Sequence, residues 1–302
     1  MRIVTRPDFD GIVCAVLLLE AENDTMDILW VEPNQIQSGT ADIQPGDIIA
    51  NLPSHADAHL WFDHHVSNTP ATPLPGAFYI APSAAGVIYD YYKSMKKLDS
   101  RFDELVRHTD MIDSADLNKD QVLHPEDYPY IILSMTIKNK DFKDIAYWDR
   151  LVDMLRQMSV EKILADPEVA ERCRQVTREN REFGRYLTDH TTVSKRISIT
   201  DFRSLEHEPS GNRFLTYSMF PDTIASVKIR YATPEKKQVL LSVGHSIFNP
   251  HCRVNVGNLL SGYGGGGHAG AGGCTLAAEG AQEKIDEILD ILMANSGENG
   301  TG

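Results

Sequence analysis

Three consecutive residues, Asp63, His64 and His65, are the side chains of this chain best suited to chemistry. They follow a short apolar run at residues 60–62, which is typical of the end of a buried strand. In open α/β sheets, ligands bind at the carboxyl ends of the strands. Because imidazoles and carboxylates together suit a divalent transition metal, we expect a metal site here. The structural alternative is that Asp63 caps a turn and one histidine lies on the surface.

A second acidic motif lies near the N-terminus. Asp8 and Asp10 stand in a turn between a predicted strand, Arg2–Thr5, and a predicted helix, Ile12–Glu20. In an extended turn, side chains two residues apart point to one side, so both carboxylates can face one or two divalent cations. Asp10 could instead cap the helix, but capping accounts for only one of the two acids. The acidic segment 110–116 offers further ligands, although each acid there would ordinarily be a solvated surface residue.

A run of four glycines followed by a histidine lies far along the chain. Such a run is costly to order, and folds tolerate that cost where the backbone must approach a ligand closely. Consecutive N–H groups suit phosphate oxygens, and the imidazole adds a donor. A flexible linker is the alternative, but linkers favour serine and lack a central histidine. We therefore expect a substrate-binding loop at Gly264, Gly265, Gly266, Gly267 and His268.

Alternating strands and helices must position the two acidic motifs. Beyond Arg2–Thr5, the predicted strands are Asp27–Glu32, Asp47–Leu52, Ala58–Phe62 and Phe78–Ile80, and the predicted helices are Ser83–Lys97 and Arg101–Ile112. This alternation indicates a doubly wound, mostly parallel sheet of the α/β class. The turns at Asp8, Asn51 and Asp63 would then share one sheet edge.

The second half of the chain changes character. Residues 125–190 are mostly helical in pattern, and the strongly charged helix Glu168–Arg185 is typical of a bridge between domains. Strand-like runs follow at 197–202, 214–220, 225–231 and 239–243, then a helix at 254–260, a strand at 274–278 and a helix at 281–293. We expect a metal-binding domain at 1–125, a helical extension and linker at 126–190, a smaller α/β domain at 191–294, and a disordered tail at 295–302.

Composition excludes several classes of function. The 302 residues suffice for two domains, and 42% hydrophobic residues are ordinary for a globular protein. A net charge of −14 argues against binding to long duplex DNA, where basic surface supplies most of the affinity. No apolar run is long enough for a membrane span, and we expect no signal peptide, because the first apolar run leads directly into polar residues. Four scattered cysteines indicate reduced thiols and a cytoplasmic protein.

The motifs and their order resemble the DHH phosphoesterase superfamily, and the glycine–histidine run resembles its DHH-associated C-terminal domain. The resemblance covers about residues 1–115 and 195–293. It implies an N-terminal α/β domain holding Mn²⁺ ions, two in typical members, with Mg²⁺ as a substitute, and a mobile C-terminal domain that grips the substrate. It also implies a divalent-metal-dependent phosphoesterase that acts on a phosphorylated small molecule or a short single-stranded oligonucleotide. The superfamily includes exopolyphosphatase-like members. A homodimer is one oligomeric state that the sequence leaves open.

The resemblance also implies roles by position. Asp8 matches a ligand of the first metal, and Asp10 and His64 match ligands of the second. Asp110 matches the late acidic ligand, with Asp113 as the substitute if the register slips.

The remaining roles concern catalysis and substrate. Asp63 would orient a histidine from outside the metal's own ligands, and His65 would face the scissile phosphate, so both count as catalytic. His268 and its glycines would hold the substrate. Arg253 is the nearest match to an arginine common before the glycine run, although Asn249 falls near that position.

Two positions depart from the family pattern. Val4 stands where members often carry a histidine, and Asn51 stands where they usually carry an aspartate that bridges two metals. An amide is a weaker, uncharged ligand, so the first metal would be looser, replaced or lost. The alternative function is therefore a weakly catalytic or non-catalytic nucleotide- or nucleic-acid-binding protein with a degraded metal site.

Overall fold

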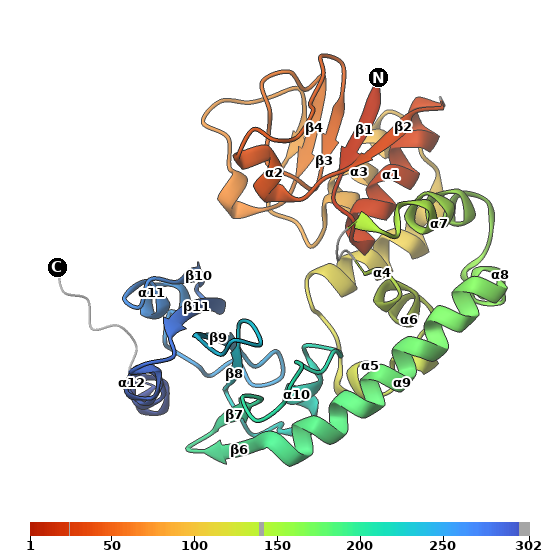
Figure 1. The fold of residues 1–302 in the computed structure, drawn as a ribbon. Coiled ribbons are helices and arrows are strands. Elements are labelled where there is room, and N and C mark those ends of the chain that lie inside the picture. Colours follow the sequence, from red (N-terminus) through yellow and green to blue (C-terminus); the bar gives the residue numbers. More distant parts are fainter. Residues whose placement is uncertain (24, 139–141, 296–302) are drawn as a thin grey trace. The chain divides into compact units, whose positions relative to one another are not determined.

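The computed structural model describes residues 1–23, 25–138 and 142–295 (Figure 1). The chain forms two compact units: unit 1 combines Met1–Leu117 with Pro125–Gln175, and unit 2 combines Asn118–His124 with Val176–Gly302. The long helix α9 (Pro167–His190) begins in unit 1 and ends in unit 2. The expected domain limits at residues 125 and 190 stay predictions, and the expected tail beyond residue 295 lies outside the described residues.

Unit 1 is built on a parallel sheet. Its described strands lie in the order β2-β1-β3-β4-β5, and every neighbouring pair is parallel. They are β1 (Arg2–Thr5), β2 (Asp27–Trp30), β3 (Ile48–Ala50), β4 (Leu60–Asp63) and β5 (Gly76–Phe78). The prediction of a parallel α/β fold is confirmed. The last strand lies two residues earlier than expected, because Trp61 of β4 pairs with Gly76.

Both faces of this sheet are buried, as parallel sheets require. Successive residues point to opposite faces, so Ile3 belongs to the core cluster that includes residues of α1, α3 and α7, while Val4 belongs to the cluster that includes Ile36 of α2. Figure 1 shows these helices beside the sheet. The described helices of unit 1 are α1 (Phe9–Glu22), α2 (Pro33–Gln37), α3 (Ala84–Ser94), α4 (Asp103–Asp113), α6 (Pro129–Met135), α7 (Ile145–Gln157) and α8 (Val160–Leu164), with short 3₁₀ segments at Val66–Asn68, Ser100–Phe102 and Pro125–Asp127. This layering leaves the carboxyl ends of the strands to carry the polar turns.

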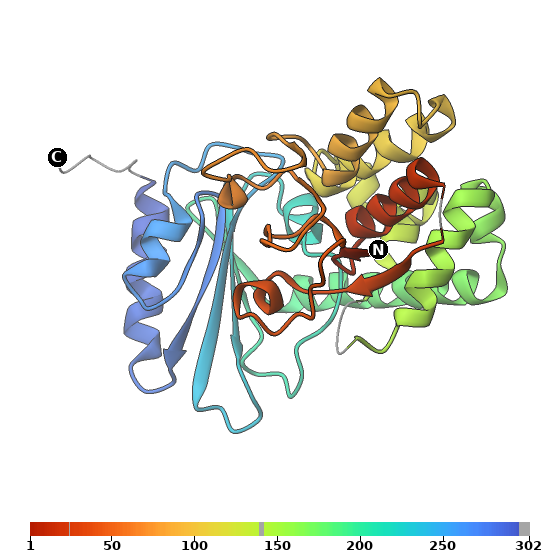
Figure 2. The ribbon, with the colours of Figure 1, turned by 90° about the horizontal axis from the view of Figure 1, so that it is seen from above.

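Unit 2 is built on a mixed sheet in the order β10-β11-β9-β8-β7-β6 among the described residues. Its strands are β6 (Thr191–Ser194), β7 (Ile197–Asp201), β8 (Ala225–Tyr231), β9 (Gln238–His245), β10 (Gly266–His268) and β11 (Ala271–Ala277). Its other helices are α5 (Lys119–Leu123), α10 (Leu215–Met219), α11 (Val256–Ser261) and α12 (Ala281–Ala294). Figure 2 shows α11 and α12 together on one face of the sheet, where Leu260, Ile285 and Leu292 enter the core.

Two predictions for unit 2 are wrong. The run 214–220, expected as a strand, forms helix α10, because the Asn212 side chain accepts the N–H of Phe214 and the Asn212 carbonyl accepts that of Leu215. A short apolar run cannot distinguish the two structures by periodicity. The glycine run, expected as a loop, supplies strand β10, which pairs with β11 in a hairpin.

Two further observations concern the whole described chain. No helix in the described ranges is apolar over enough residues to cross a lipid bilayer. All four cysteines are free thiols, with Cys14 and Cys274 buried.

Candidate metal centre

The turns that follow three neighbouring strands meet at one edge of the unit 1 sheet. Thr5 is in register with Ala50, and Ala50 with Phe62, at the carboxyl ends of β1, β3 and β4. The next residues along each strand are therefore the start of the Asp8 turn, Asn51 and Asp63. Side chains that are dispersed over about sixty residues of sequence thus come to one edge, as the predicted sheet requires.

Asp10 lies in the first turn of α1 with a fully buried carboxylate. One oxygen accepts the N–H of Ala84 at 3.0 Å and the other accepts that of Ala85 at 2.8 Å, both at the start of α3. Helix N-termini stabilise negative charge. Burial, followed by the charges of Asp113 and Asp8, nevertheless raises the pKa of Asp10 well above its ordinary value. An ionised Asp10 therefore favours a nearby cation.

His64 offers a nitrogen lone pair to the same place. Its Nδ1 lies 2.9 Å from the carbonyl oxygen of Ala81, so Nδ1–H donates and Nε2 keeps its lone pair. Nε2 is buried and makes no hydrogen bond within the described residues. It lies 3.4 Å from Asp113 and 3.9 Å from Asp10, measured to Oδ2 of each. One imidazole lone pair between two carboxylates is a donor set that fits a divalent cation.

Asp63, His64 and His65 form a second group whose ligand atoms also lie close together. The two oxygens of Asp63, a fully buried residue, already accept hydrogen bonds: Oδ1 from His64 N at 2.8 Å and from His65 Nδ1 at 2.7 Å, and Oδ2 from the Asn68 amide. Asp63 is therefore suited to orienting its neighbours. This hydrogen bond raises the pKa of His65 although burial opposes it, and the His65 side chain remains 38% exposed. An accessible imidazole whose protonated form is favoured in this way suits a phosphate group.

Asp110 and Asp113, the two acids near the end of α4, have different neighbours in the structure. Asp110 accepts a hydrogen bond from the Ser83 hydroxyl at 2.6 Å, and Ser83 also caps α3. Burial raises the pKa of Asp110, and the Ser83 bond opposes that rise. Among the described residues, Asp113 forms a compact group of ligand atoms with Asp10 and His64, and Asp110 does not. Asp113, the substitute that the sequence offered, therefore lies with Asp10 and His64, and a metal role for Asp110 stays a prediction.

Asp8 is turned toward protein groups. It caps α1 by accepting the N–H of Gly11 at 2.8 Å, and it accepts the Asn51 amide N–H at 3.0 Å. Arg6 lies 3.4 Å away. Burial raises the pKa of Asp8 to about 6, with Arg6 opposing the rise. Asn51 has a left-handed backbone (φ 58°), which asparagine tolerates better than most residues.

The glycine run in unit 2 has a structural purpose of its own. The N–H groups of Gly264 and Gly265 donate to carbonyls near the end of α11, so they do not form the open row of phosphate donors that we expected. A Cβ on Gly257 of α11 would lie 2.5 Å from the carbonyl oxygen of Gly267, so glycine lets the helix touch β10. His268 ends β10 with an exposed side chain, which leaves its imidazole accessible.

Arg253 lies in the segment before α11. Its backbone N–H donates to Asn295 at 2.8 Å, and the residue is exposed.

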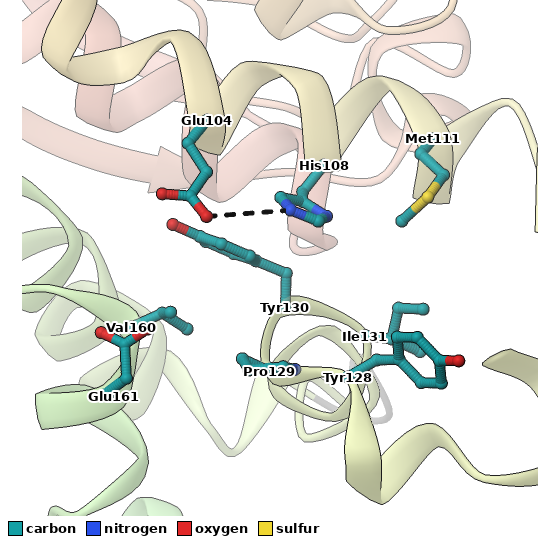
Figure 3. A pocket seen from close by; sticks show the side chains of 9 residues that line it. All are labelled: Glu104, His108, Met111, Tyr128, Pro129, Tyr130, Ile131, Val160 and Glu161. Carbon is teal, nitrogen blue, oxygen red and sulfur yellow. Dashed lines mark ion pairs between the residues drawn. The ribbon is translucent and has the colours of Figure 1, made fainter.

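A cavity of about 80 Å³ lies on the other face of α4 from Asp113. Figure 3 shows Glu104, His108 and Met111 of α4 above Tyr130, which stacks on His108 with ring centroids 4.5 Å apart. In a helix, residues 104, 108 and 111 share one face and residue 113 lies opposite. Ligand pockets are usually several times larger, so this cavity is not a substrate site.

Comparison with solved structures places the chain among known proteins. The pGpG-specific phosphodiesterase PggH from Vibrio cholerae is 32% identical, with a TM-score of 0.86 over 98% of this chain and 99% of that one. The DHH domain of a member of a family of ribosomal proteins has a TM-score of 0.61 at 11% identity, covering 96% of this chain and 86% of that one. RecJ from Thermus thermophilus in complex with Mn²⁺ has a TM-score of 0.58 at 11% identity, covering 98% and 52%. No family model and no curated protein matches the sequence.

The chain has a parallel α/β unit with an Asp/His cluster at its strand ends, followed by a mixed-sheet unit. Together with the similarity to a phosphodiesterase, these features identify a metal-dependent phosphoesterase. The chain belongs to the DHH phosphoesterase superfamily.

Proposed function

We propose that the protein is a phosphodiesterase that hydrolyses short 5′-phosphorylated oligonucleotides, with dinucleotides such as pGpG as the preferred class. The observation that carries this proposal is the buried Nε2 of His64, which faces Asp10 and Asp113 without a hydrogen bond from the described residues. The substrate class is supported by the 32% identity to a phosphodiesterase named for pGpG.

Asp10, His64 and Asp113 would hold the divalent ion. When bound, the ion polarises the phosphoryl group and offsets the charge that develops on its oxygens. We assign Mn²⁺ ahead of Mg²⁺, because a mixed imidazole and carboxylate set suits a transition metal, whereas Mg²⁺ prefers oxygen ligands and bound water.

The neighbouring residues would bind and orient the phosphodiester. His65, held through its Nδ1 by Asp63, would present its other nitrogen to the phosphate, and the Asp63 bond favours its protonated form. From this position it can donate a proton to the leaving oxygen. In unit 2, His268 and Arg253 are exposed donors suited to the substrate's remaining phosphate or sugar, and the glycine strand β10 carries His268.

A second candidate is a nucleotide-binding protein without turnover. It is favoured by one observation: the Asn51 amide donates to Asp8, so no carboxylate at position 51 is available to a metal. Turnover of any phosphodiester by the three-ligand cluster would exclude this candidate.

A substrate series tests the proposal. We expect Mn²⁺-loaded protein to hydrolyse pGpG with a higher kcat/KM than a 5′-phosphorylated hexanucleotide, 3′-phosphoadenosine 5′-phosphate, cyclic di-GMP or polyphosphate. His65→Gln should lower kcat while Mn²⁺ still binds, because in this proposal His65 contacts the substrate and not the ion. Tight pGpG binding without product under every metal would favour the second candidate.

A further inference from the structure

The positive charge beside Asp8 belongs to the guanidinium of Arg6. Arg6 follows β1 directly, and its NH1 lies 3.4 Å from Asp8 Oδ2 while its Nε donates to Glu32 Oε2 at 3.3 Å. Two acids on different segments thus hold one guanidinium at the same sheet edge as the metal cluster. The Arg6 side chain is 35% exposed, so the guanidinium remains accessible to an anion.

The surroundings of Asp8 do not fit a second divalent ion. Oδ1 of Asp8 already accepts the N–H of Gly11 and the amide of Asn51, and its other oxygen faces Arg6. Val4, fully buried in the core against α2, offers no ligand atom. Within the described residues, neither compact group of metal-ligating atoms includes Asp8.

We infer that this site uses one divalent ion together with Arg6, whose guanidinium supplies the second positive charge to the substrate phosphate. This inference rests on the proposed function, and it disagrees with the two Mn²⁺ ions implied by the family resemblance. A guanidinium has five N–H donors in a planar fork that matches two phosphate oxygens, and the two acids that hold it limit its freedom. The Asn51 amide preserves this arrangement, because it gives Asp8 a donor in place of a competing carboxylate.

The number of bound ions tests the inference without any turnover. Equilibrium dialysis with elemental analysis should give one Mn²⁺ per chain, whereas two per chain would overturn it. In the triple variant Val4→His, Asn51→Asp and Arg6→Gln, a new imidazole and carboxylate join an Asp8 freed from its cation. We expect a second Mn²⁺ to bind there in a variant whose circular dichroism is that of the parent. Continued binding of one ion would count against the inference that Arg6 takes the place of a second ion.

Substitution of Arg6 alone tests its contact with the phosphate. Arg6→Gln should weaken pGpG binding and lower kcat/KM by about ten- to hundredfold, the usual worth of a charge-assisted hydrogen bond, with one Mn²⁺ still bound. Arg6→Lys should recover part of the loss. The matched control is Arg2→Gln, because Arg2 starts the same strand and bonds to Asp47 away from the cluster. Unchanged pGpG binding and turnover in Arg6→Gln would refute the role.

The two proposals fail in different ways. If no phosphodiester is hydrolysed, the proposed function fails, while calorimetric binding of pGpG to the parent and to Arg6→Gln still decides the role of Arg6. If hydrolysis proceeds equally in Arg6→Gln and the parent, the proposed function stands and this inference fails.

Discussion

At the scale of single residues, the centre depends on how one imidazole is held. The Ala81 carbonyl takes the proton side of the His64 ring, so the lone pair of Nε2 is directed at two carboxylates. Asp63 does the same for His65 through Nδ1. Different acceptors therefore fix the two adjacent rings, which is why we propose that His64 serves the metal and His65 the phosphate.

The late acids give a prediction at this scale. Asp113→Asn should weaken Mn²⁺ binding by a large factor, because it removes one of three ligands. Asp110→Asn should keep Mn²⁺ affinity close to that of the parent, because Asp110 bonds to Ser83. Isothermal titration of both variants measures the difference. Equal losses in the two variants would show that both acids reach the ion.

At the scale of elements, the N-terminus of α3 bonds to Asp10 of α1 and to Asp110 of α4. Ser83 caps this helix, accepting the N–H of Gly86 at 2.9 Å, and donates to Asp110. The next two N–H groups bind Asp10. The helix therefore fixes one proposed ligand directly and steadies α4, which carries another.

Ser83→Ala removes both of these bonds. We expect it to lower the free energy of unfolding by about 1–2 kcal/mol, the usual worth of a helix cap, as measured by urea titration. Ser94→Ala is the matched control, because Ser94 lies exposed at the end of α3 and its hydroxyl donates to the Tyr91 carbonyl of the same helix. A loss in Ser83→Ala no greater than in this control would contradict the role of the cap.

The cavity on the far face of α4 gives a prediction for pH dependence. Burial lowers the pKa of His108 below its usual value of 6.5, helped by Arg107 and opposed by Glu104. The unfolded chain therefore takes up a proton at this residue before the folded chain does, so this contribution to stability falls as pH falls below about 6.5. His108→Gln should reduce the loss of unfolding free energy between about pH 7.5 and about pH 5.5. The exposed His207→Gln is the control, and a parent-like loss in His108→Gln would contradict the assignment.

Much of unit 1 could be predicted from the sequence, because the strands, the short turns and the helices each leave a local pattern. The sheet edge that gathers Asp10 and His64 follows from parallel topology alone. The choice between Asp110 and Asp113 could not be made, because both acids lie within one turn of α4 and only the Ser83 bond separates them. Helix α10 and strand β10 were missed because short aromatic and glycine runs are decided by tertiary contacts.

Arg6 is a residue with a proposed function that sequence reasoning overlooked. An arginine two positions before a motif aspartate looks like an ordinary surface charge. Its importance depends on Glu32, which is distant in sequence and is brought to it by β2 pairing with β1. No spacing rule within one segment could have found that pair.

At the scale of the whole molecule, the proposed metal ligands all lie in unit 1 and the proposed substrate residues His268 and Arg253 lie in unit 2. His268→Ala should therefore raise KM for pGpG, by about 1–3 kcal/mol of binding free energy if the imidazole makes a charge-assisted hydrogen bond, with Mn²⁺ affinity unchanged. Steady-state kinetics and metal titration on the same variant measure both quantities. Loss of Mn²⁺ with an unaltered KM would place His268 among the metal ligands.

The central claim is that Asp10, His64 and Asp113 hold a divalent ion on which hydrolysis of the phosphodiester depends. The most direct measurement follows release of GMP from pGpG by chelator-treated protein, before and after addition of Mn²⁺, in the parent and in His64→Ala. We expect no release before Mn²⁺ is added, recovery in the parent, and at most a small fraction of that recovery in His64→Ala. Release by the chelated parent, or full recovery in His64→Ala, would contradict the claim.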